Sequence, residues 1–156
     1  MPNQPPESDL ITWHRYFAIE SNNRAWSLTI ASRSADEDQE MLDAAHAAAW
    51  HWGFAGDELN HMRAKMLLAE VHAQLGNGTI ALRHATTMQA WFLSRETPDW
   101  EVAFVHAIFA RASLAAGDSE SYRAAYVLAE KAIAAIGDED DRKIVIQTFS
   151  RIPRPA

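Results

Sequence analysis

The feature that most restricts the fold of this chain is an internal repeat. Residues 67–77 align with residues 108–118 at an offset of 41 residues, which places Gly117 on Gly76 and keeps most apolar positions apolar. A repeat of about 40 residues built from a helix pair is typical of helical solenoids, in which each unit covers the apolar face of its neighbour. Each glycine ends a helical run just before a polar residue, so we expect both to adopt a positive φ.

The composition predicts an all-α fold. Alanine, the best helix former, supplies about one in five of the 156 residues, and no segment shows the sustained alternation of a strand. Gly, Pro, Asp and Asn divide the chain into about seven antiparallel helices, which we expect to stack as hairpins; a closed up-down helical bundle is the alternative. The predicted parts are a flexible tail at 1–7, a single domain at 8–150 with hairpins at about 8–55, 57–96 and 98–137 and a terminal helix at 138–150, and a C-terminal tail at 151–156.

Capping residues predict where several helices begin. The second helix is expected to start at Asp36, because carboxylates suit the positive end of the helix dipole. The fifth helix is expected to open with Thr97 as N-cap and Pro98 at the first helical position. Asn22 and Asn23 are a weak point at which the first segment could divide into two helices.

The third segment carries two apolar faces that are nearly opposite each other at about 100° per residue. An ordinary surface helix has one apolar stripe. We therefore predict that this helix is packed on two sides, as a stack of hairpins requires. One face comprises Ala64, Leu68, Val71 and Leu75, and the other comprises Met62, Met66, Ala69 and Ala73.

The repeat resembles the tetratricopeptide-repeat superfamily over about residues 57–137. The resemblance lies mainly in the hairpin turn and the start of the helix that follows it. The matching residues are Leu68, Ala69, Leu75, Gly76, Asn77, Ala81 and Leu82 in the first unit, and Ala110, Gly117 and Asp118 in the second. The unit is longer than the family's repeat of about 34 residues. The family's Trp and Tyr positions are occupied by Lys65, His72, His106 and Ser113.

This resemblance implies a right-handed superhelix that binds a protein or peptide without catalysis. The first helices of successive hairpins would line a concave wall, and charged groups along one edge would hold the partner. An acidic or free-carboxylate peptide is the expected ligand, because arginine forks suit carboxylates. The register nominates Arg63, Glu70, Gln74 and Arg111. The alternative edge carries His61, Lys65, His72 and His106.

Charge and composition argue against several other classes of protein. The chain has no cysteine, which excludes disulfides, thiolate nucleophiles and Cys-ligated metals. Its formal net charge of −7 argues against a nucleic-acid partner. No stretch approaches the roughly 20 apolar residues of a membrane span, so we expect no membrane partner. The N-terminus has no signal-peptide pattern, and a cytoplasmic location is the expectation.

Two alternatives to a binding module stay open. A helical metal-binding protein or enzyme would use His46, His51 and His61, because Asp43-x-x-His46 and Glu58-x-x-His61 each place a carboxylate and an imidazole on one helix face. Glu58 in a first helical turn suits the helix dipole better than a metal, so we expect no metal. The sequence has no Cys, no Gly-x-Ser-x-Gly and no Gly-x-x-x-x-Gly-Lys, so we also expect no catalytic residue and no cofactor. A structural protein whose exposed helix faces pair, as a homodimer, is the second alternative.

Six tryptophans are many for a chain of this length. Large aromatic side chains fill volume between alanine-rich helices, so we expect most of them in the core. Trp13, Trp26, Trp91 and Trp100 fall at helical core positions. A separate group around His51, formed by Trp50, Trp52 and Phe54, could line an aromatic pocket instead.

Overall fold

The computed structural model describes residues 9–156, and this range contains seven α-helices and no strand. The all-α prediction is confirmed, and the predicted tail at 1–7 lies outside the described residues. No helix in the described range is both long enough and apolar enough to cross a membrane. The helices are α1 (Leu10–Thr29), α2 (Ala35–Ala55), α3 (Glu58–Gln74), α4 (Gly78–Leu93), α5 (Asp99–Ala115), α6 (Ser119–Ala134) and α7 (Glu139–Phe149).

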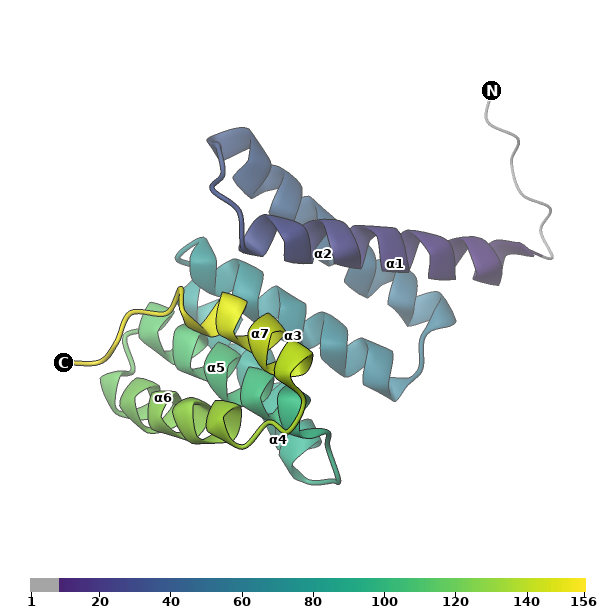
Figure 1. The fold of residues 1–156 in the computed structure, drawn as a ribbon. Coiled ribbons are helices and arrows are strands. Elements are labelled where there is room, and N and C mark those ends of the chain that lie inside the picture. Colours follow the sequence, from purple (N-terminus) through teal and green to yellow (C-terminus); the bar gives the residue numbers. More distant parts are fainter. Residues whose placement is uncertain (1–8) are drawn as a thin grey trace.

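The helices are arranged as stacked hairpins, as predicted (Figure 1). α1 pairs with α2, α3 with α4 and α5 with α6, and neighbouring hairpins pack through α2–α3 and α4–α5 contacts. The first helices of the hairpins also contact one another: α1 touches α3, α3 touches α5, and α5 touches the terminal helix α7. α1, α3, α5 and α7 therefore form one layer, which we call the first-helix wall.

The position of α3 in the stack confirms its two apolar faces. Leu68 and Val71 pack in a cluster with Met41 of α2. On the other side, Met66 belongs to a larger cluster that includes Met88 of α4 and residues of α5. Since α3 buries both faces, it joins the N-terminal hairpin to the rest of the molecule.

Two helices begin one residue away from the predicted positions. The hydroxyl of Ser34 accepts the Glu37 N–H at 3.3 Å and the Glu37 carboxylate accepts the Ser34 N–H at 2.8 Å, so this capping box starts α2 one residue early. Pro98 is the N-cap of α5. Thr97 does not cap this helix, because its hydroxyl donates to the carbonyl of Phe92 at 2.6 Å.

The first helix departs from prediction in two ways. α1 runs unbroken through Asn22 and Asn23, so the weak point does not divide it. Trp13 was expected in the core, but it is 39% exposed. The reason is visible in Figure 1, where the N-terminal half of α1 extends beyond the stacked helices.

The C-terminal segment packs against the stack without forming a helix. Ile152 is buried, and the Tyr122 hydroxyl donates a hydrogen bond to the carbonyl of Pro153. Arg151 donates to the carbonyl of Ile30, directly after α1. The predicted tail at 151–156 is therefore non-helical, as expected, but it contacts both ends of the stack.

The two repeat glycines adopt the predicted conformation. Gly76 and Gly117 each have a φ of 79°. In both turns the N–H of the following residue donates to the carbonyl five residues earlier, which is the Schellman arrangement. These hydrogen bonds join Asn77 to His72 at 2.8 Å and Asp118 to Ser113 at 2.9 Å. The equal geometry confirms the 41-residue register.

Valine at either repeat glycine should lower the free energy of unfolding by about 1 kcal/mol or more, because a β-branched residue is strained at positive φ. Gly53→Ala is the matched control. Gly53 lies inside α2, and an added Cβ meets no heavy atom within 4 Å. This variant should be as stable as wild type or up to about 1 kcal/mol more stable. Urea denaturation measures all three variants, and wild-type stability of Gly76→Val and Gly117→Val would contradict the register.

Candidate functional site

A cavity of about 370 Å³ opens on the first-helix wall. All four helices of the wall, or the residues just after them, contribute to its lining. We call this feature the groove, and its principal side chains are Trp26 from α1, Arg63 and Met66 from α3, Trp100, Glu101 and Phe104 from α5, and Ile144 and Gln147 from α7. The groove therefore exists only because the hairpins stack, since no single hairpin supplies its whole lining.

Aromatic rings form an apolar surface in the groove. The ring centroids of Trp26 and Phe104 are 5.9 Å apart, and those of Trp100 and Phe104 are 6.2 Å apart with perpendicular planes. Phe104 is buried and both tryptophans are half-buried. Such edge-to-face rings present a rigid apolar surface that suits an aliphatic or aromatic side chain.

One arginine stands over this aromatic surface. Arg63 donates from Nε and Nη2 to the two carboxylate oxygens of Glu101, at 2.7 and 3.1 Å. Its guanidinium carbon lies 5.7 Å from the ring centroid of Trp100. The hydrogen bond to Glu101 raises the pKa of Arg63 above its usual value. Glu101 is buried whereas 41% of the Arg63 side chain is exposed, so the groove presents an arginine that is already paired.

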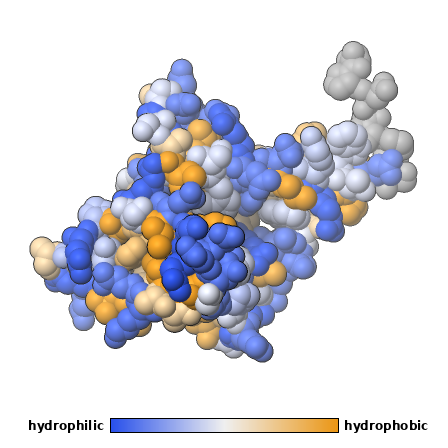
Figure 2. Space-filling model, in the orientation of Figure 1, coloured by the Kyte–Doolittle hydropathy of each residue, from blue (hydrophilic) through white to orange (hydrophobic). Residues whose placement is uncertain are grey.

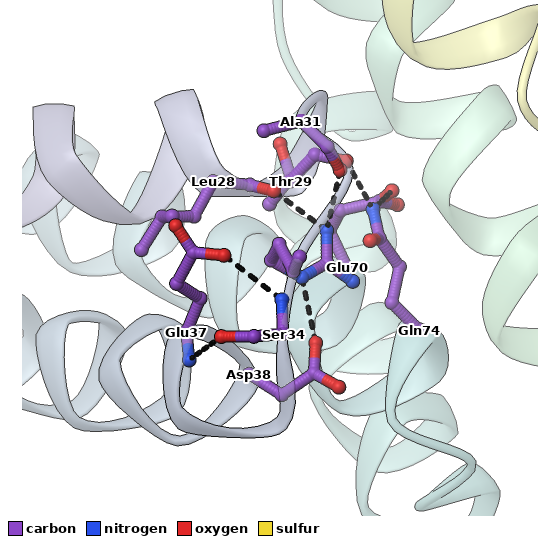
Figure 3. Close-up of polar contacts among 9 residues, drawn as sticks. Leu28, Thr29, Ala31, Ser34, Glu37, Asp38, Glu70 and Gln74 are labelled. Carbon is purple, nitrogen blue, oxygen red and sulfur yellow. Dashed lines mark hydrogen bonds and ion pairs between the residues drawn. The ribbon is translucent and has the colours of Figure 1, made fainter.

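Glu70, Gln74 and Arg111 form a network inside the protein. Arg111 Nε lies 3.0 Å from Glu70 Oε1 as an ion pair without an aligned hydrogen bond. Gln74 Nε2 donates to the same oxygen at 2.7 Å and to the carbonyl of Thr29 at 3.0 Å (Figure 3). Arg111 also donates to the carbonyl of Thr148 at 3.5 Å. The network therefore connects all four helices of the first-helix wall.

The interior position of this network changes the role expected for Glu70, Gln74 and Arg111, which were predicted to bind a ligand. Glu70 has no exposed surface, and only 13% of the Arg111 side chain is exposed. Of the four nominated residues, only Arg63 lines the groove. Arg63 and Arg111 were expected to face one concave surface together, but Arg111 is oriented toward the buried carboxylate. A ligand carboxylate would therefore meet Arg63 alone.

The alternative edge holds a cluster of histidines. His72 is buried, and its Nε2 lies 3.1 Å from Nε2 of His46, while its Nδ1 lies 3.2 Å from the amide nitrogen of Asn77. Burial and the neighbouring charge of Lys65 lower the pKa of His84, which stacks on His72, to about 4. Burial and His46 also lower the pKa of His72. The lowered pKa of His72 and His84 favours the neutral form of these two rings, which does not attract an anion.

The rest of this edge is dispersed. His61 lies beside the end of α2, with its Nε2 2.9 Å from the carbonyl of Trp52. His106 is half-buried on α5, where burial lowers its pKa. Lys65 and His72 both lie near His84. In the described part of the chain, His61 and His106 make no hydrogen bond or ion pair with either of them.

The histidines of the metal-binding alternative are also separated. His46 contacts His72, His61 contacts a backbone carbonyl, and His51 Nδ1 lies 2.8 Å from Nδ1 of His14. Within residues 9–156, no group of three or more His, Asp or Glu side chains is placed to hold a metal ion.

The aromatic part of the groove was missed by reading the sequence. Trp26 and Trp100 were interpreted as core residues because their helical positions are next to apolar ones. A signal was present in the repeat itself. Arg63 and Phe104 occupy equivalent positions at the 41-residue offset, and both line the groove.

No family model, curated protein or solved structure matches this chain. The tetratricopeptide resemblance stays an interpretation of the turn residues and the repeat. The geometry of the groove is therefore the basis for its function.

Arg111→Met should lower the free energy of unfolding by about 3 kcal/mol near neutral pH, because it leaves the buried Glu70 carboxylate without its ion-pair partner. The methionine keeps the apolar stem of the side chain. Adding Glu70→Gln to this variant removes the stranded charge and should restore most of the loss. Denaturation of the two single variants and the double variant gives the coupling energy, and strictly additive effects would contradict the assigned network.

The loss of unfolding free energy in Arg111→Met should also depend on pH. Burial raises the pKa of Glu70, and Arg111 opposes that rise. A carboxyl with a raised folded-state pKa loses stability as pH increases through that pKa, because the unfolded chain ionises first. Without Arg111 the pKa rises further, so the stability difference from wild type should be small in acidic buffer and grow toward neutral pH. A difference that does not vary with pH would contradict this reading of Glu70.

Proposed function

We propose that this protein is a non-catalytic helical-repeat module that binds a protein or peptide segment in the groove. The observation that carries the proposal is the position of the cavity, which lies on the first-helix wall and combines half-buried aromatic rings with a half-exposed arginine. The tetratricopeptide resemblance supports it, because proteins of that kind are expected to bind partners along the first helices. A cytoplasmic setting belongs to the same proposal.

The chemistry of the groove favours a segment with an apolar anchor. Trp26, Trp100 and Phe104 offer an apolar surface to one large side chain of the partner. The Nη1 atom of Arg63 makes no hydrogen bond within the described residues, and it could donate to a carboxylate placed beside that anchor. An acidic or free-carboxylate peptide therefore remains the proposed ligand class, with the apolar side chain as its main attachment.

The best test uses variants that change the groove and spare the buried ion pairs. Arg63→Ala is unsuitable, because it strands the buried Glu101 carboxylate. Trp100→Ala removes part of the aromatic surface. Ser27→Arg places a large side chain at the exposed rim of the cavity without removing a buried group. Leu128→Ala is the control, since Leu128 is an exposed apolar residue on α6 outside the groove.

A random peptide library with free carboxyl termini, selected on the full chain, should yield peptides that pair an apolar residue with a terminal or side-chain carboxylate. Fluorescence anisotropy of a selected peptide should show binding weakened by at least about tenfold in Trp100→Ala and Ser27→Arg, as for a central interface residue. Leu128→Ala should bind like wild type. The groove would be rejected as the binding site if the selected peptide bound Ser27→Arg as tightly as wild type. It would also be rejected if the selection enriched the same peptides on Trp100→Ala as on wild type.

A further inference from the structure

The projecting half of the N-terminal hairpin exposes a group of large apolar side chains. All of them are between 39 and 66% exposed, and Ala18 is the only buried residue in the first half of α1. In Figure 2 this part of the molecule shows small hydrophobic patches among hydrophilic residues. We call the group the aromatic end; it consists of Leu10, Ile11, Trp13, Tyr16 and Phe17 on α1, and Trp50 and Phe54 on α2.

The rings of the aromatic end hold one another in place. Trp13 stacks on Phe17 at 5.8 Å and meets Tyr16 edge-to-face at 6.0 Å. Trp50 meets Phe54 edge-to-face at 5.3 Å. His14 stacks on Phe54 at a centroid distance of 4.2 Å and joins the α1 rings to the α2 rings. The surface is therefore continuous across two helices, and binding would immobilise few additional side chains.

The size of this surface matches one side of a stable interface. Seven side chains of roughly 200 Å² each, about half exposed, offer about 700 Å². A standard interface buries about 800 Å² on each partner. Trp, Tyr and Phe are also the residues enriched in interface cores. The aromatic end is thus large enough to supply a whole interface.

The charge pattern favours a second copy of this chain as the occupant. A two-fold interface brings each patch against itself, so a patch with net charge would repel its own copy. None of the seven residues is ionic. The ionisable pair between them is His14 and His51, whose facing Nδ1 atoms at 2.8 Å suit a neutral N–H donor and a neutral acceptor. Arg15, next to them, donates to the carbonyl of Ala55.

We propose that the aromatic end is the interface of a homodimer. The α1–α2 hairpin of one chain packs on that of its partner as a four-helix arrangement about a two-fold axis. This inference is separate from the groove, which uses the C-terminal half of α1. A membrane surface is a less suitable occupant, because peripheral helices carry Lys and Arg around their apolar face, and the aromatic end has one neighbouring arginine.

Light scattering of the full chain during size exclusion tests the proposal. Wild type at micromolar concentration should have twice the mass of one chain. Trp50→Asp places a carboxylate at the most exposed ring and should give one chain's mass with unchanged helicity and melting temperature. Leu128→Asp, at an exposed leucine on α6, is the matched control and should stay dimeric. A monomeric wild type, a dimeric Trp50→Asp or a dissociated control would overturn the proposal.

A second measurement does not depend on how the aspartate variants fold. Because the chain has no cysteine, Tyr16→Cys and Leu128→Cys each carry one thiol, and a short bismaleimide should cross-link only Tyr16→Cys into dimers. Flotation with phosphatidylcholine vesicles, with and without phosphatidylserine, tests the other occupant. Vesicle binding that is lost in Trp50→Asp, together with no cross-linked Tyr16→Cys dimer, would assign the aromatic end to membranes and overturn the homodimer.

Discussion

The carboxylate of Glu70 is buried where all four helices of the first-helix wall meet. Arg111 reaches it from α5, and Gln74 connects it to the carbonyl of Thr29 at the end of α1. A buried ion pair is weak evidence for stability by itself, because desolvation offsets much of the attraction. Its effect here is positional: the charged groups meet their partners only when α1, α3, α5 and α7 are stacked in this register. The groove depends on the same register.

The parts of the fold that could be predicted from the sequence follow from local chemistry. Gly76 and Gly117 need only their own backbone conformation, and the two faces of α3 follow from spacing along one helix. The partners of the charged residues are different. Arg63 pairs with Glu101 across 38 residues, a distance set by how hairpins stack and not by any helical period. Arg63, which was predicted to face a ligand, lines the groove and is also paired with a neighbouring helix.

The same limit explains the aromatic residues. A half-buried tryptophan in a groove and a tryptophan in a core occupy similar positions in the heptad pattern, so Trp26 and Trp100 could not be distinguished from core residues. Trp13 could not be recognised as exposed, because its exposure depends on how far α1 extends past α3. As a result α1 carries two surfaces, with Trp26 in the groove toward its end and Trp13 in the aromatic end toward its start.

The hydrogen bond from Arg151 to the carbonyl of Ile30 has a consequence for how the molecule unfolds. In a linear array each repeat contacts only its neighbours, so terminal repeats can fray while the middle remains folded. Here the segment after α7 reaches back to the end of the first helix, 121 positions earlier in the chain. Opening at the C-terminal end therefore releases a contact of the N-terminal hairpin as well. In a short array tied in this way, we expect the two ends to be coupled, so that fraying at one end favours fraying at the other.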